Sequence, residues 1–171
     1  MGARETRAEK AALSDVVLTN SEDHLIVYFK VKDCFTEDMI KAIENGIETT
    51  FTFFVRLHEK TEFLWNKKVA DIEIKHSIRY DNLKRVYEVR LSEKGEDVVY
   101  TKDLEKAKRI MATIEELKIA RLETLIKGRH YRLRMMAELD KIKLPLYLHN
   151  ILFFLSLWDF QTDWYQIDFR Y

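Results

Sequence analysis

The sequence predicts a mainly β or α+β protein: an antiparallel β-sandwich or curved sheet with two to three short helices. The first reason is period-two alternation of apolar and polar residues, which is typical of half-buried strands. It is clearest over residues 69–80, where one face carries Ala70, Ile72, Ile74, Ile78 and Tyr80. The second reason is that only four glycines and one proline occur, so most of the chain should be regular structure.

The first part of the chain reads as two strands and a helix. Strands are expected at residues 13–18 and 25–31, around a turn at residues 20–23. Thr36 can cap a helix that ends near Gly46, and its apolar stripe consists of Met39, Ile40, Ile43 and Ile47.

The middle of the chain reads as a meander. Residues 49–58 are rich in β-branched and aromatic side chains and predict a strand. A strand over residues 69–80 follows, and a turn at Asp81-Asn82 leads back through Tyr87, Val89 and Leu91. After a turn at residues 94–97, a short strand is expected at residues 98–100.

An amphipathic helix is predicted over residues 103–118, with an apolar side of Leu104, Ala107, Ile110, Met111, Ile114 and Leu117. Alternation then predicts strands at residues 131–139 and 164–171. The order of Gly128 and Tyr131 is compatible with an immunoglobulin-like sandwich. An α+β sheet with helices on one face is the alternative.

The length and composition predict a single globular domain over residues 12–171, after a disordered or appended segment at residues 1–11. Lys plus Arg and Asp plus Glu each number 29. This balance argues against a nucleic-acid partner, which requires a strongly basic face. Residues 1–10 are polar, so we expect neither a signal peptide nor a transmembrane span in this sequence.

No catalytic, cofactor-binding or metal-binding residue can be assigned from the sequence. The motifs for a phosphate loop, a nucleophile elbow and a paired-histidine zinc site are absent. The histidines, which are His24, His58, His76, His130 and His149, fall on separate elements. Cys34 is the single cysteine; we expect a buried or half-buried structural thiol, and its place before the Thr36 helix leaves a nucleophile as the alternative.

Residues 144–158 form an uncharged apolar segment that begins with Leu144-Pro145. Fifteen helical residues would extend roughly 22 Å, which is too short to cross a bilayer. Three interpretations remain open: a core element, a surface for a partner protein or a second copy, and a lipid-contacting element. The predicted contact residues are Leu148, Ile151, Leu152, Phe153, Phe154, Trp158 and Trp164.

Two ordered sets of residues carry a resemblance to a known family. The first is the run of residues 42–47, the strand at residues 49–57, Trp65 and Arg79-Tyr80; the second is Tyr131-Arg132-Leu133-Arg134, Leu139-Asp140, Leu144-Pro145, Ser156-Leu157-Trp158 and Asp163-Trp164. In order and spacing they resemble the exported bacterial proteins grouped as domain of unknown function 4390. The resemblance implies a periplasmic or cell-envelope protein whose signal peptide is missing from this sequence. It implies no activity, cofactor or catalytic residue.

These observations lead to one preferred function and two alternatives. We expect a non-enzymatic envelope protein that acts by contact with another envelope protein or with its own copy. The first alternative is binding or sensing of a hydrophobic small molecule or lipid, held between the sheet and residues 144–158. The second alternative is an enzyme with an unfamiliar site, which would require Cys34 or two histidines to converge in a polar pocket.

Overall fold

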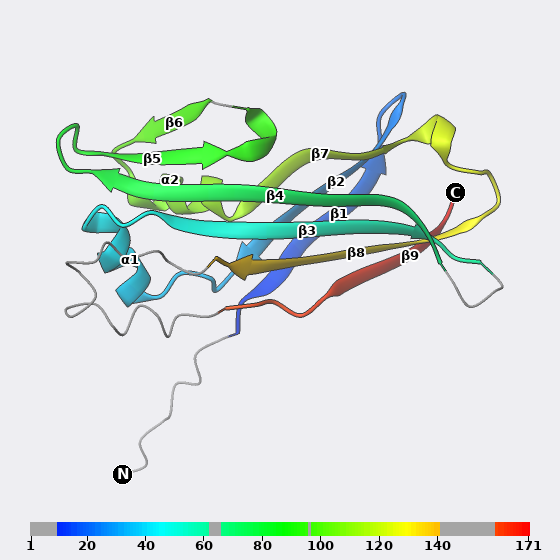
Figure 1. The fold of residues 1–171 in the computed structure, drawn as a ribbon, viewed down its shortest axis with the longest axis horizontal. Helices are drawn as coiled ribbons and strands as arrows, with labels where there is room; N and C mark the ends of the chain where they lie inside the picture. The colour runs from blue at the N-terminus through cyan, green and yellow to red at the C-terminus, as the bar shows by residue number, and fades with distance from the viewer. Residues whose placement is uncertain (1–9, 62–65, 96, 141–159) are drawn as a thin grey trace, which may run out of the picture.

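The computed structural model describes residues 10–61, 66–95, 97–140 and 160–171, and Figure 1 shows how their elements are arranged. The strands are β1 (Ala12–Asn20), β2 (His24–Lys32), β3 (Thr49–Glu59), β4 (Lys67–Asp81), β5 (Val86–Leu91), β6 (Val98–Thr101), β7 (Thr113–Arg121), β8 (His130–Leu139) and β9 (Tyr165–Arg170). The helices are α1 (Glu37–Glu44) and α2 (Leu104–Met111), with short 3-10 turns η1 (Ser92–Lys94) and η2 (Leu122–Thr124).

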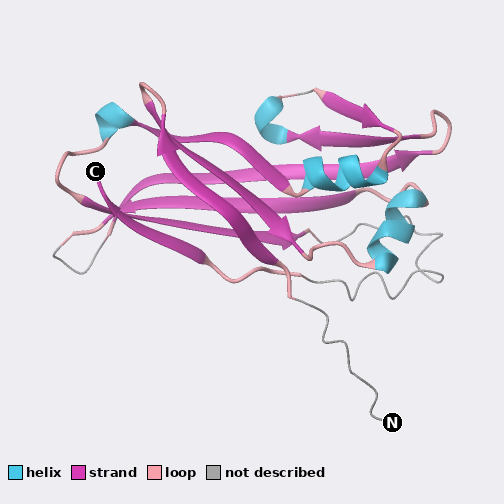
Figure 2. Cartoon of the chain, turned by 180° about the vertical axis from the view of Figure 1, so that it is seen from behind, coloured by secondary structure: helices cyan, strands magenta, loops and turns pink. Residues whose placement is uncertain are grey.

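The strands form two antiparallel sheets. One sheet has three strands in the order β1-β2-β7, and the other has six strands in the order β6-β5-β4-β3-β8-β9. Figures 1 and 2 show the three-stranded sheet, α1 and α2 on one face of the six-stranded sheet. The predicted antiparallel, β-rich class with short helices is therefore confirmed.

The interior lies between the two sheets, where the alternating apolar residues of each sheet meet. Phe29 of β2 and Phe53 of β3 contact edge to face across this interior, with ring centroids 6.0 Å apart. Val31 of β2 donates its backbone N–H to the carbonyl of Ala112, which ties β2 to the junction between α2 and β7. Ala11, which the sequence placed in the N-terminal segment, is only 6% exposed and belongs to this core.

The sheet order distinguishes between the architectures that the sequence left open. In an immunoglobulin constant domain, strands A, B, E and D form one sheet and strands C, F and G the other. Here β3, β4, β5 and β6 follow one another as a meander within the six-stranded sheet, and β8 and β9 extend the same sheet. The sandwich is therefore present with a strand order that differs from the immunoglobulin arrangement.

Helix α1 begins and ends where local chemistry predicts. The Thr36 side chain accepts a hydrogen bond from the backbone N–H of Met39, which satisfies one of the free donors of the first turn. The helix buries Met39 and Ile43 against the core. Gly46 follows the helix with φ of 82°, a left-handed conformation that glycine adopts without steric cost.

The helix predicted over residues 103–118 is wrong beyond Met111. Asp103 caps α2 by accepting a hydrogen bond from the backbone N–H of Lys106, but the helix ends at Met111. From Thr113 the chain forms β7, which pairs with β2 in the three-stranded sheet. Ile114 and Leu117 are buried as predicted, although a strand and not a helix turns them inward.

The helix predicted after Pro145 lies outside the described residues. Within the described ranges, no helix is both long enough and apolar enough to cross a lipid bilayer.

Candidate functional site

The candidate site lies on the face of the six-stranded sheet that points away from the three-stranded sheet. Within the described part of the chain, no strand or helix covers this face, which is turned toward the viewer in Figure 1. Of the predicted contact residues, only Trp164 belongs to the described residues. Trp164 immediately precedes β9 and is half-buried. The description of the candidate site therefore starts from Trp164 and the side chains that contact it.

Trp164 lies between two arginines from neighbouring strands. The guanidinium carbon of Arg56 on β3 is 5.1 Å from the centre of the Trp164 ring, and that of Arg134 on β8 is 4.6 Å away. Tryptophan presents the most favourable aromatic face for a cation, and each such contact contributes roughly 0.5–1 kcal/mol at an exposed site. We call these three side chains the Trp164 cluster.

The two arginines of the Trp164 cluster are direct register partners of β3 and β8. Like charges in such opposed positions destabilise an antiparallel sheet. Two interactions reduce this cost. Both guanidinium groups contact the ring of Trp164, and Arg56 also donates a hydrogen bond through Nε to the Asp71 carboxylate, at 3.1 Å. Among the described residues, Arg134 has no ion pair. Its guanidinium can therefore bind a carboxylate supplied from outside.

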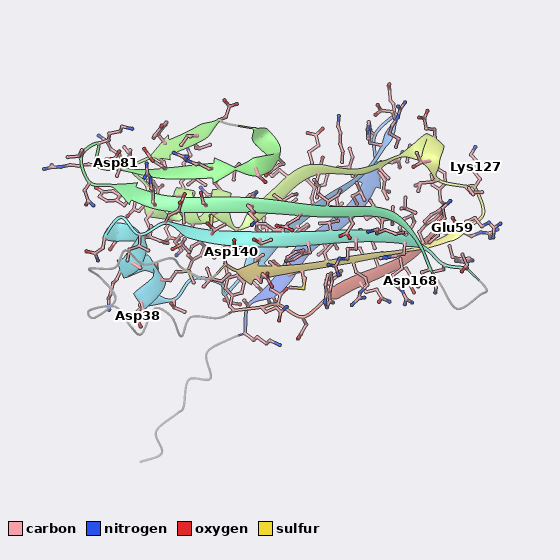
Figure 3. All side chains as sticks on the ribbon, in the orientation of Figure 1. Asp38, Glu59, Asp81, Lys127, Asp140 and Asp168 are labelled. Atoms are coloured by element: carbon pink, nitrogen blue, oxygen red, sulfur yellow. The ribbon has the colours of Figure 1, made fainter. Side chains whose placement is uncertain are left out.

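Ion pairs fix the strands on both sides of the Trp164 cluster. Arg132 donates two hydrogen bonds to Asp168, at 2.8 and 2.9 Å, which joins β8 to β9 at the sheet edge where Figure 3 labels Asp168. Lys60 adds a third bond, at 3.2 Å. The hydrogen bonds from Arg132 and Lys60 hold the pKa of Asp168 well below its usual range. These pairs are partly exposed, so we attribute to them the positioning of β9 and not a large share of stability.

On the β4 side of the Trp164 cluster, Asp71 binds Arg56, as Asp168 binds Arg132 on the β9 side. Hydrogen bonds from Lys68 and then from Arg56 lower the pKa of the Asp71 carboxyl. Asp71 is therefore a carboxylate at neutral pH, and it fixes the Arg56 guanidinium while Arg56 contacts Trp164. The Trp164 cluster thus has one arginine, Arg56, bound to a carboxylate, and one, Arg134, without a carboxylate partner among the described residues.

A second feature is a surface depression of about 360 Å³ between the chain after β2 and helix α2. It is lined by Val31, Asp33, Cys34, Phe35, Glu105, Lys108, Arg109 and Ala112. Cys34 is 4% exposed, which confirms its predicted burial, and its Sγ donates to the carbonyl oxygen of Val31 at 3.5 Å.

The environment of Cys34 keeps the sulfur protonated. Burial raises the pKa of the thiol to about 12, so the thiolate, the nucleophilic form, is scarce at neutral pH. The lining residues include two lysine or arginine side chains, but no histidine that could act as a base. The thiol therefore lacks the activation that a cysteine nucleophile needs.

The histidines of the described ranges lie on four different strands, β2, β3, β4 and β8. Within these ranges, no group of three or more His, Cys, Asp or Glu side chains could hold a metal ion. His76 is fully buried, and its Nε2 lies 3.0 Å from Glu93, a contact that sequence analysis missed. The alternation of β4 did contain the signal, because residue 76 shares the inward parity of Ile74 and Ile78. His149 lies outside the described residues.

Comparison with known proteins gives one result. The model of the family described as Domain of unknown function (DUF4390) matches residues 8–168. The chain belongs to the DUF4390 family. No curated protein and no solved structure matches it. The resemblance found from the ordered motifs is thereby confirmed, and this DUF4390 protein takes no residue assignment from a relative.

Proposed function

We propose that this DUF4390 protein acts without catalysis, by binding another protein of the bacterial cell envelope through the Trp164 cluster. The observation that supports this proposal is the placement of two directly opposed arginines around a half-buried tryptophan, on a sheet face that no described strand or helix covers. Positions that break a local rule of strand pairing are expected at functional sites. Tryptophan and arginine are also the residue types that dominate binding energy in protein interfaces.

The chemistry of the Trp164 cluster specifies the kind of partner. Arg134 has no carboxylate partner among the described residues, and the exposed part of the Trp164 ring offers apolar area beside it. A matching surface carries an Asp or Glu next to an apolar side chain, so that the carboxylate binds the guanidinium and the apolar group packs on the ring. The location in the envelope is inferred from the exported proteins that the sequence resembles.

Two features support a binding role over an enzymatic one. The Cys34 depression contains a thiol that burial keeps protonated, and no histidine lines it. The carboxylates beside the Trp164 cluster, Asp71 and Asp168, form ion pairs that stabilise their charged forms, whereas general acids and bases require pKa values near neutrality. The predicted hydrophobic-ligand function depends on residues 144–158, which lie outside the described residues, and it stays a prediction.

The test is affinity capture from periplasmic extract with tagged wild-type protein and with the variants Trp164→Ala and Arg134→Ala. The matched control is Tyr165→Ala, because Tyr165 is the adjacent aromatic residue and is 41% exposed. A central interface residue contributes about 2 kcal/mol or more, which corresponds to a loss of about thirtyfold in affinity. We expect a partner that wild type and Tyr165→Ala retain and that both cluster variants lose.

Light scattering tests self-association with the same variants. A wild-type dimer that Trp164→Ala converts to a monomer would identify the partner as a second copy. The proposal is wrong if wild-type protein is a monomer that retains no partner, or if Trp164→Ala retains every partner of wild type while remaining as stable to urea.

A further inference from the structure

The end of the six-stranded sheet that lies opposite α1 is strongly basic. At this end β3 and β9 finish and β4 and β8 begin, as Figure 1 shows, and Figure 3 labels Glu59, Lys127 and Asp168 there. The strand ends are direct neighbours, because Glu59 pairs with both Lys67 and Tyr131 in the sheet register. We call the seven lysine and arginine side chains of these strand ends and of the turn before β8 the basic end: Lys60, Lys67, Lys68, Lys127, Arg129, Arg132 and Arg170.

Carboxylates of the chain neutralise only part of this charge. Within the described ranges, the ion pairs of the basic end reach three carboxylates, which are Glu59, Asp71 and Asp168. Lys67 and Lys127 are exposed and have no ion pair in these ranges. Seven cations against three carboxylates leave an excess of four positive charges at this end of the sheet.

The excess is local, because Lys plus Arg and Asp plus Glu each number 29 in the whole chain. The adjoining end of the three-stranded sheet is not basic: Arg121 pairs with Glu123, and the β1–β2 turn carries the exposed Glu22 and Asp23. Adjacent strands lie about 5 Å apart, and salt screens charges over about 10 Å, so the cations of the basic end act together. The molecule therefore has a positive pole at one end of the six-stranded sheet.

Apolar side chains accompany these cations. Ile126, in the turn between η2 and β8, is 50% exposed and directly precedes Lys127. In the sequence, residues 62–65 between β3 and β4 read Glu-Phe-Leu-Trp, and Lys67-Lys68 follow one residue later. Apolar and aromatic residues next to lysines are typical of segments at a bilayer interface, where the cations meet phosphates and the apolar groups meet the headgroup boundary.

We propose that the basic end binds the headgroups of an anionic phospholipid bilayer. The cations are spread over four strand ends and one turn, and a bilayer matches this spread because its phosphates form an extended plane of negative charge. The Trp164 cluster lies on the face of the sheet and not at its end, so a protein bound to a bilayer in this way keeps that face accessible. The inference does not depend on the protein partner proposed for the Trp164 cluster.

Co-sedimentation with vesicles tests the proposal. Wild-type protein is mixed with sucrose-loaded vesicles of phosphatidylcholine alone, or of phosphatidylcholine and phosphatidylglycerol in equal parts. We expect binding to the vesicles that contain phosphatidylglycerol and no binding to phosphatidylcholine alone. Binding should weaken about tenfold or more between about 0.05 M and about 0.5 M salt, because screening shortens the reach of the charges.

The decisive variant combines Lys67→Gln with Lys127→Gln, which removes two exposed cations without breaking an ion pair in the described ranges. Each lysine near an anionic surface contributes a factor of about five, so this variant should bind about thirtyfold more weakly. The matched control combines Lys94→Gln with Lys102→Gln, which removes the same charge from exposed positions in η1 and before α2. The control should bind as wild type does.

Trp164→Ala separates this test from that of the protein partner. The variant retains the basic end, so it should bind the anionic vesicles as wild type does, even where it loses the partner. Failure of wild type to bind these vesicles at low salt overturns the proposal, and so does equal binding by the double variant and its control. Polyglutamate serves as a second probe: a protein that binds polyglutamate but not the vesicles has an acidic protein as its ligand, which also overturns the proposal.

Discussion

Truncation of Phe53 and Phe54 to alanine tests which face of β3 forms the interior. Phe53 is 0% exposed and contacts the rings of Phe29 and His76, whereas Phe54 is half-buried on the opposite face. Removal of a fully buried phenylalanine costs about 3–5 kcal/mol, because apolar contacts are lost and a cavity remains. Removal of the half-buried ring should cost about 1 kcal/mol, as for an average substitution. The two changes remove the same atoms one residue apart.

The assay is urea unfolding followed by circular dichroism, with thermal unfolding in parallel. For a domain of this size, 1 kcal/mol shifts Tm by about 2–4 °C. Phe53→Ala should therefore lower Tm by roughly 6–20 °C, and Phe54→Ala by only a few degrees. Equal losses for the two variants, or a larger loss for Phe54→Ala, would show that the inward and outward faces of the six-stranded sheet are assigned incorrectly.

Two further predictions concern local interactions. Asp103→Ala should destabilise the protein by about 0.5–2 kcal/mol in urea unfolding, because it removes the side chain that caps α2, while the exposed neighbour Lys102→Ala should have little effect. The second prediction concerns Glu88, whose pKa is lowered from 4.5, chiefly by its hydrogen bond from Arg79. Because the pKa is lower in the folded state, the contribution of Glu88 to stability is present above about pH 4.5 and is lost as the pH falls through the folded value. Urea unfolding should therefore show a larger difference between wild type and Glu88→Gln at neutral pH than at about pH 3, and a constant difference would contradict the assignment.

Most of the strands could be predicted because their side chains follow strict alternation. The strands around residues 25–31, 49–58, 69–80 and 131–139 each place apolar residues on one face, and each is present. The hairpin turns were marked by polar or glycine-containing runs, at residues 20–23 and 94–97. In these segments, local propensity and tertiary burial require the same conformation, so the sequence is sufficient.

The candidate sites could be predicted only in part, because they depend on strand pairing. Trp164 was selected as an aromatic residue, but the contacts of its ring with Arg56 and Arg134 require that β3 and β8 be neighbours. These arginines are 78 positions apart in a register that no local pattern specifies. The pairing of His76 with Glu93 is closer in sequence, but it depends on the turn η1 folding back over β4.

The wrong helix at residues 112–118 has a physical cause that applies to other sheet proteins. In a regular strand, Ile114 and Leu117 would face opposite sides, because their positions differ by three. The pairing with β2 shifts register between Val27 and Phe29, and Glu116 adopts φ of 52°, so β7 contains an extra residue at this point. The bulge turns Ile114 and Leu117 to the same side, and an i, i+3 apolar pair in a strand then imitates a helical stripe. Since Thr113 and Ile114 are β-branched, propensity favoured the strand, but the periodic pattern of residues 104–111 continued through the bulge without interruption.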